Sequence, residues 1–385
     1  MSRKQSRRSW LKSSVALATG IAVTPFSGIA SHPRKYKRIQ TIEHDLVIPP
    51  QIPQLKARLL ANENPYGPSP ATIEAMKAAL SRGNRYPMNE GMEFFSLIVE
   101  KEGLNQDHVL IGPGSTQLLD MVATELAGSG NVVTADPSYM AMVETIDNIG
   151  GKTIAVPLTH DGQHDLDAME SMIDDSVSLV YVVNPNNPTG TITDSNKLRE
   201  FCRRVSDKVP VFIDEAYLDF IDDAMSHSMV DLVREGKNVI IARTFSKIYG
   251  MAGIRVGYIC GLPDTIKSIW KQAHVEWGVS AASIAGAKAA LSEQDFLTQC
   301  RKDNMATKQF VYQMLEEMEY DYMPSSTNFI LFPIKMRPNQ FQDAMFSKGV
   351  GIRVFEIGRK PYCRVSMGTM EEMEIFKEAF QEVVG

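Results

Sequence analysis

The sequence contains few of the residues that define a disulfide framework or a metal site. Its 385 residues include four cysteines and seven histidines. The histidines form no HxxxH or similar cluster, so we expect no metal site. The cysteines are scattered, without close pairs or metal-ligand spacing, and the sequence selects no disulfide among them. They are Cys202, Cys260, Cys300 and Cys363.

Internal repeats, low-complexity tracts and an excess of basic residues are also missing. The formal net charge is −6, and this acidic balance argues against nucleic acid as a partner. An apolar run from Val15 to Val23 is too short, and too rich in Gly and Thr, for a membrane span, so we expect no stable membrane insertion. A hydrophobic content of 44% is ordinary for a globular protein, and the length suits a large domain with a smaller one.

Residues 1–30 have the composition of an export signal, with five basic and no acidic side chains. The segment Ser6-Arg-Arg-Ser-Trp-Leu-Lys12 resembles the bacterial twin-arginine signal, with Trp10 where phenylalanine is more usual. Gly28-Ile-Ala30 is a candidate cleavage site. These features predict a periplasmic protein. A retained N-terminal anchor is one alternative, and a cytoplasmic protein whose basic segment is not a signal is another.

The rest of the chain divides by pattern into three parts. Residues 31–68 are predicted to be a linker and an N-terminal arm that joins the small domain. Residues 69–280 alternate strands with helices, which predicts a large cofactor-binding domain of the α/β class with a mostly parallel sheet and helices on both faces. Residues 281–385 begin with long helices and continue with β-rich runs, which predicts a smaller α+β domain.

Lys247 is the first candidate catalytic residue. It follows the β-branched run Val239-Ile-Ile-Ala242, which indicates a buried strand. Burial disfavours the ammonium form, lowers the pKa and leaves an amine that can attack a carbonyl. Ser246 and Arg255 add a hydroxyl and a permanent cation, and an amine beside an anion-binding pair suits pyridoxal 5′-phosphate (PLP). The alternative is an exposed loop lysine that has no role in chemistry.

Two further stretches carry polar groups at expected strand ends. Ser115, in Gly112-Pro-Gly-Ser-Thr116, is expected to cap a helix whose free N–H groups form an anion site, although a capped turn that binds nothing is the alternative. Asp214 directly follows the apolar Val211-Phe-Ile213, so we expect a buried carboxylate that needs a cation. A protonated pyridine nitrogen would be such a cation.

Taken together, these residues resemble the fold-type I PLP enzymes, and within them the histidinol-phosphate aminotransferase group. The likeness runs from about residue 58 to the end, with Asn184-Pro-Asn-Asn-Pro-Thr-Gly190, Asp214-Glu-Ala-Tyr217 and Ser246-Lys247 in the family's order and spacing. The resemblance implies three catalytic residues: Lys247, which bonds to the cofactor aldehyde and moves protons, Asp214, which holds the pyridine nitrogen protonated, and Tyr217.

The resemblance also implies the other binding residues. Asn187 and Tyr217 would hydrogen-bond the phenolic oxygen of the cofactor, and Tyr139 would stack on its ring. Substrate would be bound by Arg364 at its acid group, by Arg353 at a phosphate, and by Asn328 and Tyr66, with a structural ion pair as the alternative for Arg353. The phosphate of the cofactor would be held by Gly114, Ser115, Thr116, Ser246 and Arg255, and by Tyr86 of a second copy.

The predicted function is therefore a PLP-dependent aminotransferase that moves an amino group between an amino acid or amino-phosphate donor and a 2-oxo acid, in a homodimer with shared active sites. One alternative is another PLP reaction on the same scaffold, such as decarboxylation of a phosphorylated amino acid, a cyclisation or a replacement reaction. A PLP-binding or amino-acid-binding protein without catalysis is a second alternative. The sequence does not identify the donor or the acceptor.

Overall fold

The computed structural model describes residues 41–43, 55–128, 130–272 and 278–385. The predicted export signal, residues 1–30, and most of the predicted linker lie outside these ranges, so both stay predictions. Within the described residues, no helix has an apolar stretch long enough to cross a bilayer.

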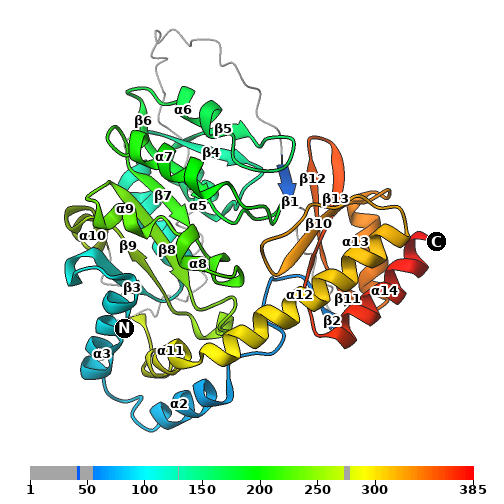
Figure 1. The fold of residues 1–385 in the computed structure, drawn as a ribbon, viewed down its shortest axis with the longest axis horizontal. Helices are drawn as coiled ribbons and strands as arrows, with labels where there is room; N and C mark the ends of the chain where they lie inside the picture. Colours follow the sequence, from blue (N-terminus) through cyan, green and yellow to red (C-terminus); the bar gives the residue numbers. More distant parts are fainter. Residues whose placement is uncertain (1–40, 44–54, 129, 273–277) are drawn as a thin grey trace, which may run out of the picture. The chain divides into compact units, whose positions relative to one another are not determined.

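A seven-stranded sheet forms the centre of the larger part of the described chain (Figure 1). The strand order is β3-β9-β8-β7-β6-β4-β5, and the neighbours from β8 to β5 are parallel. The two remaining pairings, of β9 with β3 and with β8, are antiparallel, and the majority of parallel pairings confirms the predicted mostly parallel α/β fold. The strands are β3 (Val109–Gly112), β4 (Asn131–Asp136), β5 (Lys152–Pro157), β6 (Val177–Val183), β7 (Val211–Asp214), β8 (Val239–Thr244) and β9 (Gly257–Cys260).

Helices cover both faces of this sheet because its central strands are apolar on both sides. Every residue of β7 and β8 is buried, as expected for parallel strands between two helical layers. One apolar layer joins the sheet to α4 (Ser115–Val122), α5 (Ala141–Asn148) and α10 (Pro263–Trp270). The opposite layer includes α3 (Met88–Glu102), α6 (Leu166–Ser171), α7 (Ser195–Val205) and α9 (Val230–Arg234).

Helix α7 shows how the local sequence produces this arrangement. Asp194 caps its first turn by accepting a hydrogen bond from the backbone N–H of Lys197. Apolar side chains recur at helical spacing and are buried against the sheet, whereas Lys197 and Arg204 between them are exposed. The buried residues are Leu198, Phe201, Cys202 and Val205.

A smaller α+β region is built on an antiparallel sheet with the order β1-β12-β13-β10. A short arm strand, β2 (Ala57–Arg58), pairs in parallel with β11 (Val350–Gly351) and so attaches the N-terminal arm to this region. The other elements are β1 (Thr41–Glu43), β10 (Phe329–Pro333), β12 (Arg353–Ile357), β13 (Lys360–Ser366), α13 (Pro338–Ser347) and α14 (Met370–Val384).

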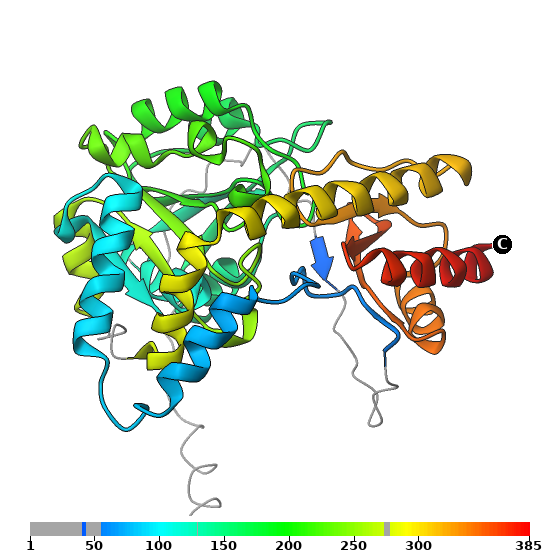
Figure 2. The same cartoon turned by 60° about the horizontal axis from the view of Figure 1, so that its bottom comes forward.

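Helix α12 (Gln294–Glu317) belongs to both regions. Figure 2 shows it as one long helix that connects them. Leu297 and Cys300 at its start pack into the core of the large sheet, whereas Val311 and Met314 pack into the core of the small region. The preceding helix, α11 (Ala281–Ser292), also packs in the large core, against α2 (Pro70–Leu80) and α3. Packing therefore changes within α12 rather than at residue 281.

The start of α4 differs from the sequence prediction. Gly114, not Ser115, occupies the N-cap position, with a φ of 94°, and Ser115 is the first helical residue. The prediction that Ser115 caps this helix is therefore wrong. A Cβ at position 114 would overlap the guanidinium group of Arg255, so glycine is required there for its positive φ and for space.

Candidate active site

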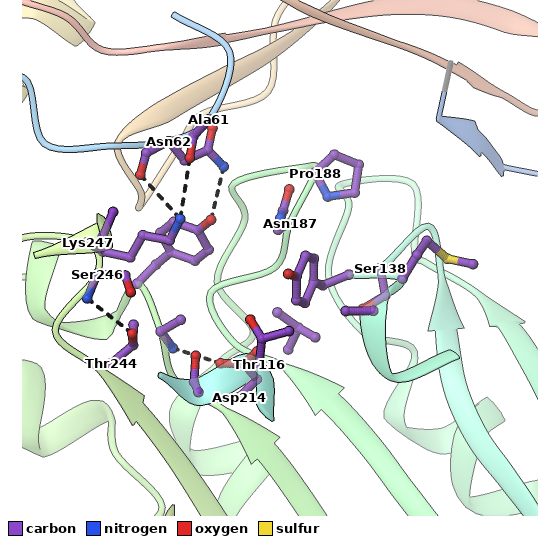
Figure 3. Close-up of a pocket in the computed structure, with 18 of the residues that line it drawn as sticks. Ala61, Asn62, Thr116, Ser138, Asn187, Pro188, Asp214, Thr244, Ser246 and Lys247 are labelled. Atoms are coloured by element: carbon purple, nitrogen blue, oxygen red, sulfur yellow. Dashed lines mark hydrogen bonds between the residues drawn. The ribbon is translucent and has the colours of Figure 1, made fainter. Parts of the chain in front are cut away.

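A cavity of about 530 Å³ lies at the carboxyl ends of β6, β7 and β8 (Figure 3). Ligands of open parallel sheets bind at this end of the strands. The cavity brings together residues from the N-terminal arm, the large sheet and the small sheet. The sequence-predicted residues that line it are Ser115, Thr116, Tyr139, Asn187, Asp214, Tyr217, Ser246, Lys247, Arg255, Arg353 and Arg364.

Lys247 is partly buried and lines the cavity, so it is not an exposed loop lysine. Its Nζ donates to the backbone carbonyl of Asn62, at 3.3 Å, and lies 3.5 Å from that of Ala61. Burial and, to a smaller extent, the Arg364 guanidinium lower the pKa of Lys247 to about 8, although Asp214 opposes both. A substantial fraction of this amine is therefore neutral near pH 8, the form that attacks an aldehyde.

Asp214 lies at the end of β7 and is 3% exposed. Its Oδ1 accepts a hydrogen bond from the backbone N–H of Ala216, at 3.1 Å. Burial raises the pKa of Asp214 to about 6, although that hydrogen bond and Lys247 lower it. A buried carboxylate with a raised pKa favours a cationic ligand, and the protonated ring nitrogen of PLP fits this requirement.

An anion cradle lies beside these two residues. The first turn of α4 presents Ser115 and Thr116 to the cavity, with backbone N–H groups that have no partner within the helix. Arg255 donates from Nη1 to Ser246 Oγ, at 3.2 Å, and to the carbonyl of Ala252, at 3.0 Å. A helix start, a hydroxyl and a guanidinium group together fit the phosphate of PLP.

Two hydrogen-bond donors lie across the cavity, and residues of the small region and of the arm orient them. Arg364 Nη1 donates to Asn187 Oδ1, at 2.7 Å, which leaves the amide nitrogen of Asn187 as the donor on its other side. Asn62 Nδ2 donates to the hydroxyl oxygen of Tyr217, at 3.0 Å. Asn187 and Tyr217 therefore suit the phenolic oxygen of PLP.

Arg353 and Arg364 are direct partners in the register between β12 and β13. Both side chains line the cavity, and like charges directly opposite in a sheet repel each other. Arg364 is 6% exposed and its guanidinium lies 5.3 Å from the ring centres of Phe329 and Phe355. Two guanidinium groups at the wall of one cavity fit an anionic ligand.

Four of the predicted site residues do not line this cavity, and three of them, Tyr86, Asn328 and Tyr66, line other cavities. Tyr86 is 74% exposed and lines a separate apolar groove with residues of α3, β3 and α10. Asn328 and Tyr66 line a small neighbouring cavity, and the amide of Asn328 donates to the carbonyl of Glu63, at 3.1 Å. Neither Asn328 nor Tyr66 lines the large cavity of the chain that carries it.

Gly114 is the fourth predicted residue that does not line the large cavity, and its contact is with Arg255, which does line it. It lies directly against the Arg255 guanidinium at the start of α4, as described above. Among the described residues, no three His, Cys, Asp or Glu side chains form a group that could hold a metal ion.

A buried ion-pair network lies beneath the cavity, on the opposite face of the same strands. Arg243 Nε lies 3.0 Å from Glu215 Oε2, and the guanidinium also approaches Glu102 Oε2, at 4.0 Å. Glu215 accepts from the backbone N–H of Met229, at 2.8 Å, and Arg243 donates to Ser228 Oγ, at 3.0 Å. This network, which we call the Arg243 brace, fastens the strand end that carries Asp214 to the strand that leads to Lys247.

Sequence reasoning missed several residues that line the cavity. Asn62 is the most informative, because it contacts Lys247 through its carbonyl and Tyr217 through its amide. Its φ of 53° lies in the left-handed region, which asparagine tolerates better than most residues, and the available sequence signal was an asparagine in the turn-rich segment 62–66. The other missed lining residues include Ser138, Met140, Glu144, Thr244 and Phe355.

Comparison with known proteins agrees with this geometry. Residues 56–380 match the family model described as aminotransferase class I and II. The chain is 34% identical to the histidinol-phosphate aminotransferase of Moorella thermoacetica, over 90% of this chain and 89% of that protein. It is 33% identical to histidinol-phosphate aminotransferase 2 of Nitrosospira multiformis, over 83% of this chain and 81% of that protein.

The fold is similar to that of the histidinol-phosphate aminotransferase of Sinorhizobium meliloti, which was solved in complex with pyridoxal-5′-phosphate. The TM-score is 0.79 with 26% identity, and the match covers 86% of this chain and 91% of that one. The fold and the cavity define a PLP-dependent transferase.

The chain belongs to the aminotransferase class I and II family. It is a PLP-dependent aminotransferase, which confirms the predicted enzyme class and cofactor. When bound, PLP supplies an aldehyde for the substrate amine and a ring that accepts the electrons released at the substrate Cα.

Proposed function

We propose that this aminotransferase acts on an amine that carries an anionic group, with a phosphorylated amine such as histidinol phosphate as the first candidate and a 2-oxo acid as amino acceptor. The observation that carries this proposal is the pair Arg353 and Arg364, opposite each other on neighbouring strands and both directed to the cavity. Guanidinium groups bind phosphate and carboxylate in two-pronged geometry. Two such groups suit a phosphorylated donor and a dicarboxylic acceptor in turn.

We assign the chemical roles as follows. Lys247 Nζ would hold the cofactor at its aldehyde carbon and, once the substrate amine has displaced it there, would carry the proton removed from the substrate Cα. Asp214 holds the proton on the ring nitrogen, and Asn187 and Tyr217 donate to the phenolic oxygen. Ser115, Thr116, Ser246 and Arg255 bind the phosphate, Tyr139 covers the ring, and Arg364 orients the acid group of the substrate.

Replacing Arg353 tests the substrate assignment. In Arg353→Met, KM for a phosphorylated amine is expected to rise about 10- to 100-fold, because a charge-assisted hydrogen bond contributes roughly 1.5–3 kcal/mol. The unphosphorylated amine should lose much less. Steady-state kinetics with histidinol phosphate and histidinol measures the difference, and Arg359→Met, an exposed arginine in the turn between β12 and β13, is the matched control.

An equal loss for both amines in Arg353→Met would contradict a phosphate-binding role. Formation of the oxo product with consumption of a 2-oxo acid separates transamination from the other PLP reactions. Release of CO2, or a product that keeps its nitrogen, would instead support decarboxylation, cyclisation or replacement.

We infer a homodimer in which Tyr86 reaches the cofactor phosphate of the second copy. In support, Tyr86 is exposed beside other exposed apolar side chains, Met88 and Met92, around an apolar groove of about 340 Å³. Exposed apolar patches of this kind mark protein interfaces. Mixing Tyr86→Phe chains with Lys247→Ala chains is expected to give hybrid dimers with one intact site. Sedimentation analysis that finds only monomers at micromolar concentration would overturn the proposal.

We also propose that residues 1–30 direct export by the twin-arginine route and that the enzyme acts in the periplasm. The support is the paired Arg7 and Arg8 ahead of an uncharged apolar run. Cell fractionation should place the protein in the periplasm, without residues 1–30. An Arg7→Lys, Arg8→Lys variant should remain in the cytoplasm, and unchanged location of that variant would contradict the proposal.

A further inference from the structure

Asn62 joins three parts of the chain at the cavity. It lies in the N-terminal arm and is 2% exposed. Its amide contacts Tyr217 of the large domain and Ser366 of the small sheet, and its backbone carbonyl contacts Lys247. Figure 3 shows Asn62 and Ala61 directly above the Lys247 amine.

Hydrogen-bond directions around Asn62 are fixed by its two contacts with Ser366. The backbone N–H of Asn62 donates to Ser366 Oγ, at 2.9 Å, so the hydroxyl hydrogen of Ser366 is directed elsewhere. Ser366 Oγ donates this hydrogen to Asn62 Oδ1, at 2.8 Å. The amide oxygen is therefore on the Ser366 side, and the Nδ2 donor faces the hydroxyl oxygen of Tyr217, at 3.0 Å.

This direction has a consequence for Tyr217. Because its oxygen accepts from Asn62, the hydroxyl hydrogen cannot point toward the arm. Tyr217 is 4% exposed and lines the cavity, so a ligand bound there would meet its hydroxyl group. Ser366 lies two residues after Arg364 on β13, and both therefore share one face of that strand. Arg364 contacts Asn187, and Ser366 contacts Asn62, which in turn contacts Tyr217. The single strand β13 therefore orients both Asn187 and Tyr217.

We propose that Asn62 and Ser366 are positioning residues for transamination, which direct the Tyr217 hydroxyl hydrogen at the phenolic oxygen of bound PLP. The inference rests on the role proposed above for Tyr217. The backbone at position 62 supports it, since the left-handed φ of 53° holds the amide in place and favours asparagine over β-branched residues. The other charged groups around Lys247 are Arg364, Asp214, Glu63 and Arg255, and the test below leaves them unchanged.

A spectroscopic pH titration of the PLP-loaded enzyme tests the proposal without measuring turnover. Tyr217→Phe is expected to raise the pH midpoint of the visible absorbance change by about one unit. One pH unit corresponds to about 1.4 kcal/mol, which is close to the net free energy of one hydrogen bond. The Tyr217 hydroxyl stabilises negative charge on the phenolic oxygen. Its loss therefore raises the pKa of the proton that lies beside this oxygen. Asn62→Gly, which keeps the left-handed backbone, should raise the midpoint by a smaller amount.

The double variant separates positioning from a general disturbance. If Asn62 acts through Tyr217, Asn62→Gly should add nothing to Tyr217→Phe, because the hydroxyl group it orients is gone. Asn62→Asp is the second variant, because a carboxylate can only accept and should turn the hydroxyl hydrogen toward itself. It should shift the midpoint more than Asn62→Gly does. Ser366→Ala should shift it in the same direction.

Asn64→Ala is the matched control in the same arm. Its amide donates to the Ile248 carbonyl and approaches Cys300 Sγ, without contact to Tyr217, so the midpoint should not move. Equal shifts from Asn62→Gly with and without the Tyr217 hydroxyl, or no shift in a variant with a normal thermal melt, would overturn the inference. A Tyr217→Phe variant with an unshifted midpoint would instead overturn the role of Tyr217 itself.

Discussion

Lys247→Ala is expected to lower kcat by a factor on the order of 10⁴, because the variant loses the group that transfers the proton at the substrate Cα. Borohydride reduction of the PLP-loaded wild-type enzyme should leave a pyridoxyl group on Lys247. Peptide mass spectrometry detects this label directly. Steady-state turnover with an amino donor and a 2-oxo acid measures the loss of activity.

Lys308 provides a matched control within the same chain. Burial also lowers its pKa to about 8, but its Nζ donates to the Ser325 carbonyl, at 2.7 Å, and it does not line the cavity. If the position at the cavity, and not the lowered pKa alone, determines which lysine reacts with PLP, Lys308 should carry no label. Capture of PLP by the wild-type apoenzyme should accelerate as the pH rises through about 8, where Lys247 loses its proton. Label on Lys308, or undiminished turnover in Lys247→Ala, would contradict the assignment.

Asp214→Asn is expected to lower kcat about a thousandfold. A charge pair near 4 Å in a medium of effective dielectric constant near 20 contributes roughly 4 kcal/mol, and the variant loses this stabilisation of the protonated ring. The asparagine oxygen can still accept from the Ala216 N–H, so the local backbone should remain in place. Turnover measured at saturating PLP separates this effect from weaker cofactor binding.

Although Asp214→Asn should lower activity, it should not lower the stability of the apoenzyme. Burial raises the pKa of Asp214 to about 6, above the ordinary value of 3.8, so the folded apoenzyme holds this proton more tightly than the unfolded chain. Ionisation of Asp214 therefore costs stability as the pH rises from about 4 to 6, and the full cost is present at pH 8. Asp214→Asn should unfold at an equal or higher denaturant concentration than the wild type at pH 8.

Glu215→Gln is the neighbouring control. It weakens the Arg243 brace and leaves a buried cation with less compensation, and loss of a partner from a buried pair costs about 3–5 kcal/mol. Its main effect should be on stability. A large loss of kcat in Glu215→Gln with an unchanged melt, or a large loss of stability in Asp214→Asn, would contradict the separate roles of these two carboxylates.

The sequence predicted those parts of the site that depend on local pattern. Asp214 and Lys247 each follow an apolar β-branched run, and both lie at the cavity as expected. The alternation of strands and helices gave the correct fold class. Such features depend on neighbours in the chain, where sequence is informative.

The parts that sequence did not predict depend on contacts between distant residues. Asn62 meets Tyr217 and Ser366 only after the arm crosses the cavity. The opposition of Arg353 and Arg364 depends on the register of β12 and β13. Ser115 was misplaced as a cap because the requirement at position 114 comes from Arg255, which is distant in sequence. Asn328 and Tyr66 match a motif, yet both line a small neighbouring cavity.

The alternation of side chains along β7 and β8 limits how this enzyme can change by insertion or deletion. Asp214 faces the cavity and Glu215 faces the Arg243 brace, while Thr244 faces the cavity and Arg243 faces away from it. Because the two faces alternate with a period of two, a single-residue indel within β7 would exchange Asp214 for a side chain of the opposite face, and one within β8 would exchange Thr244 for Arg243. Length changes should therefore accumulate in the connections at the other ends of these strands, residues 206–210 and 235–238, and a library that varies only those connections should retain cofactor loading.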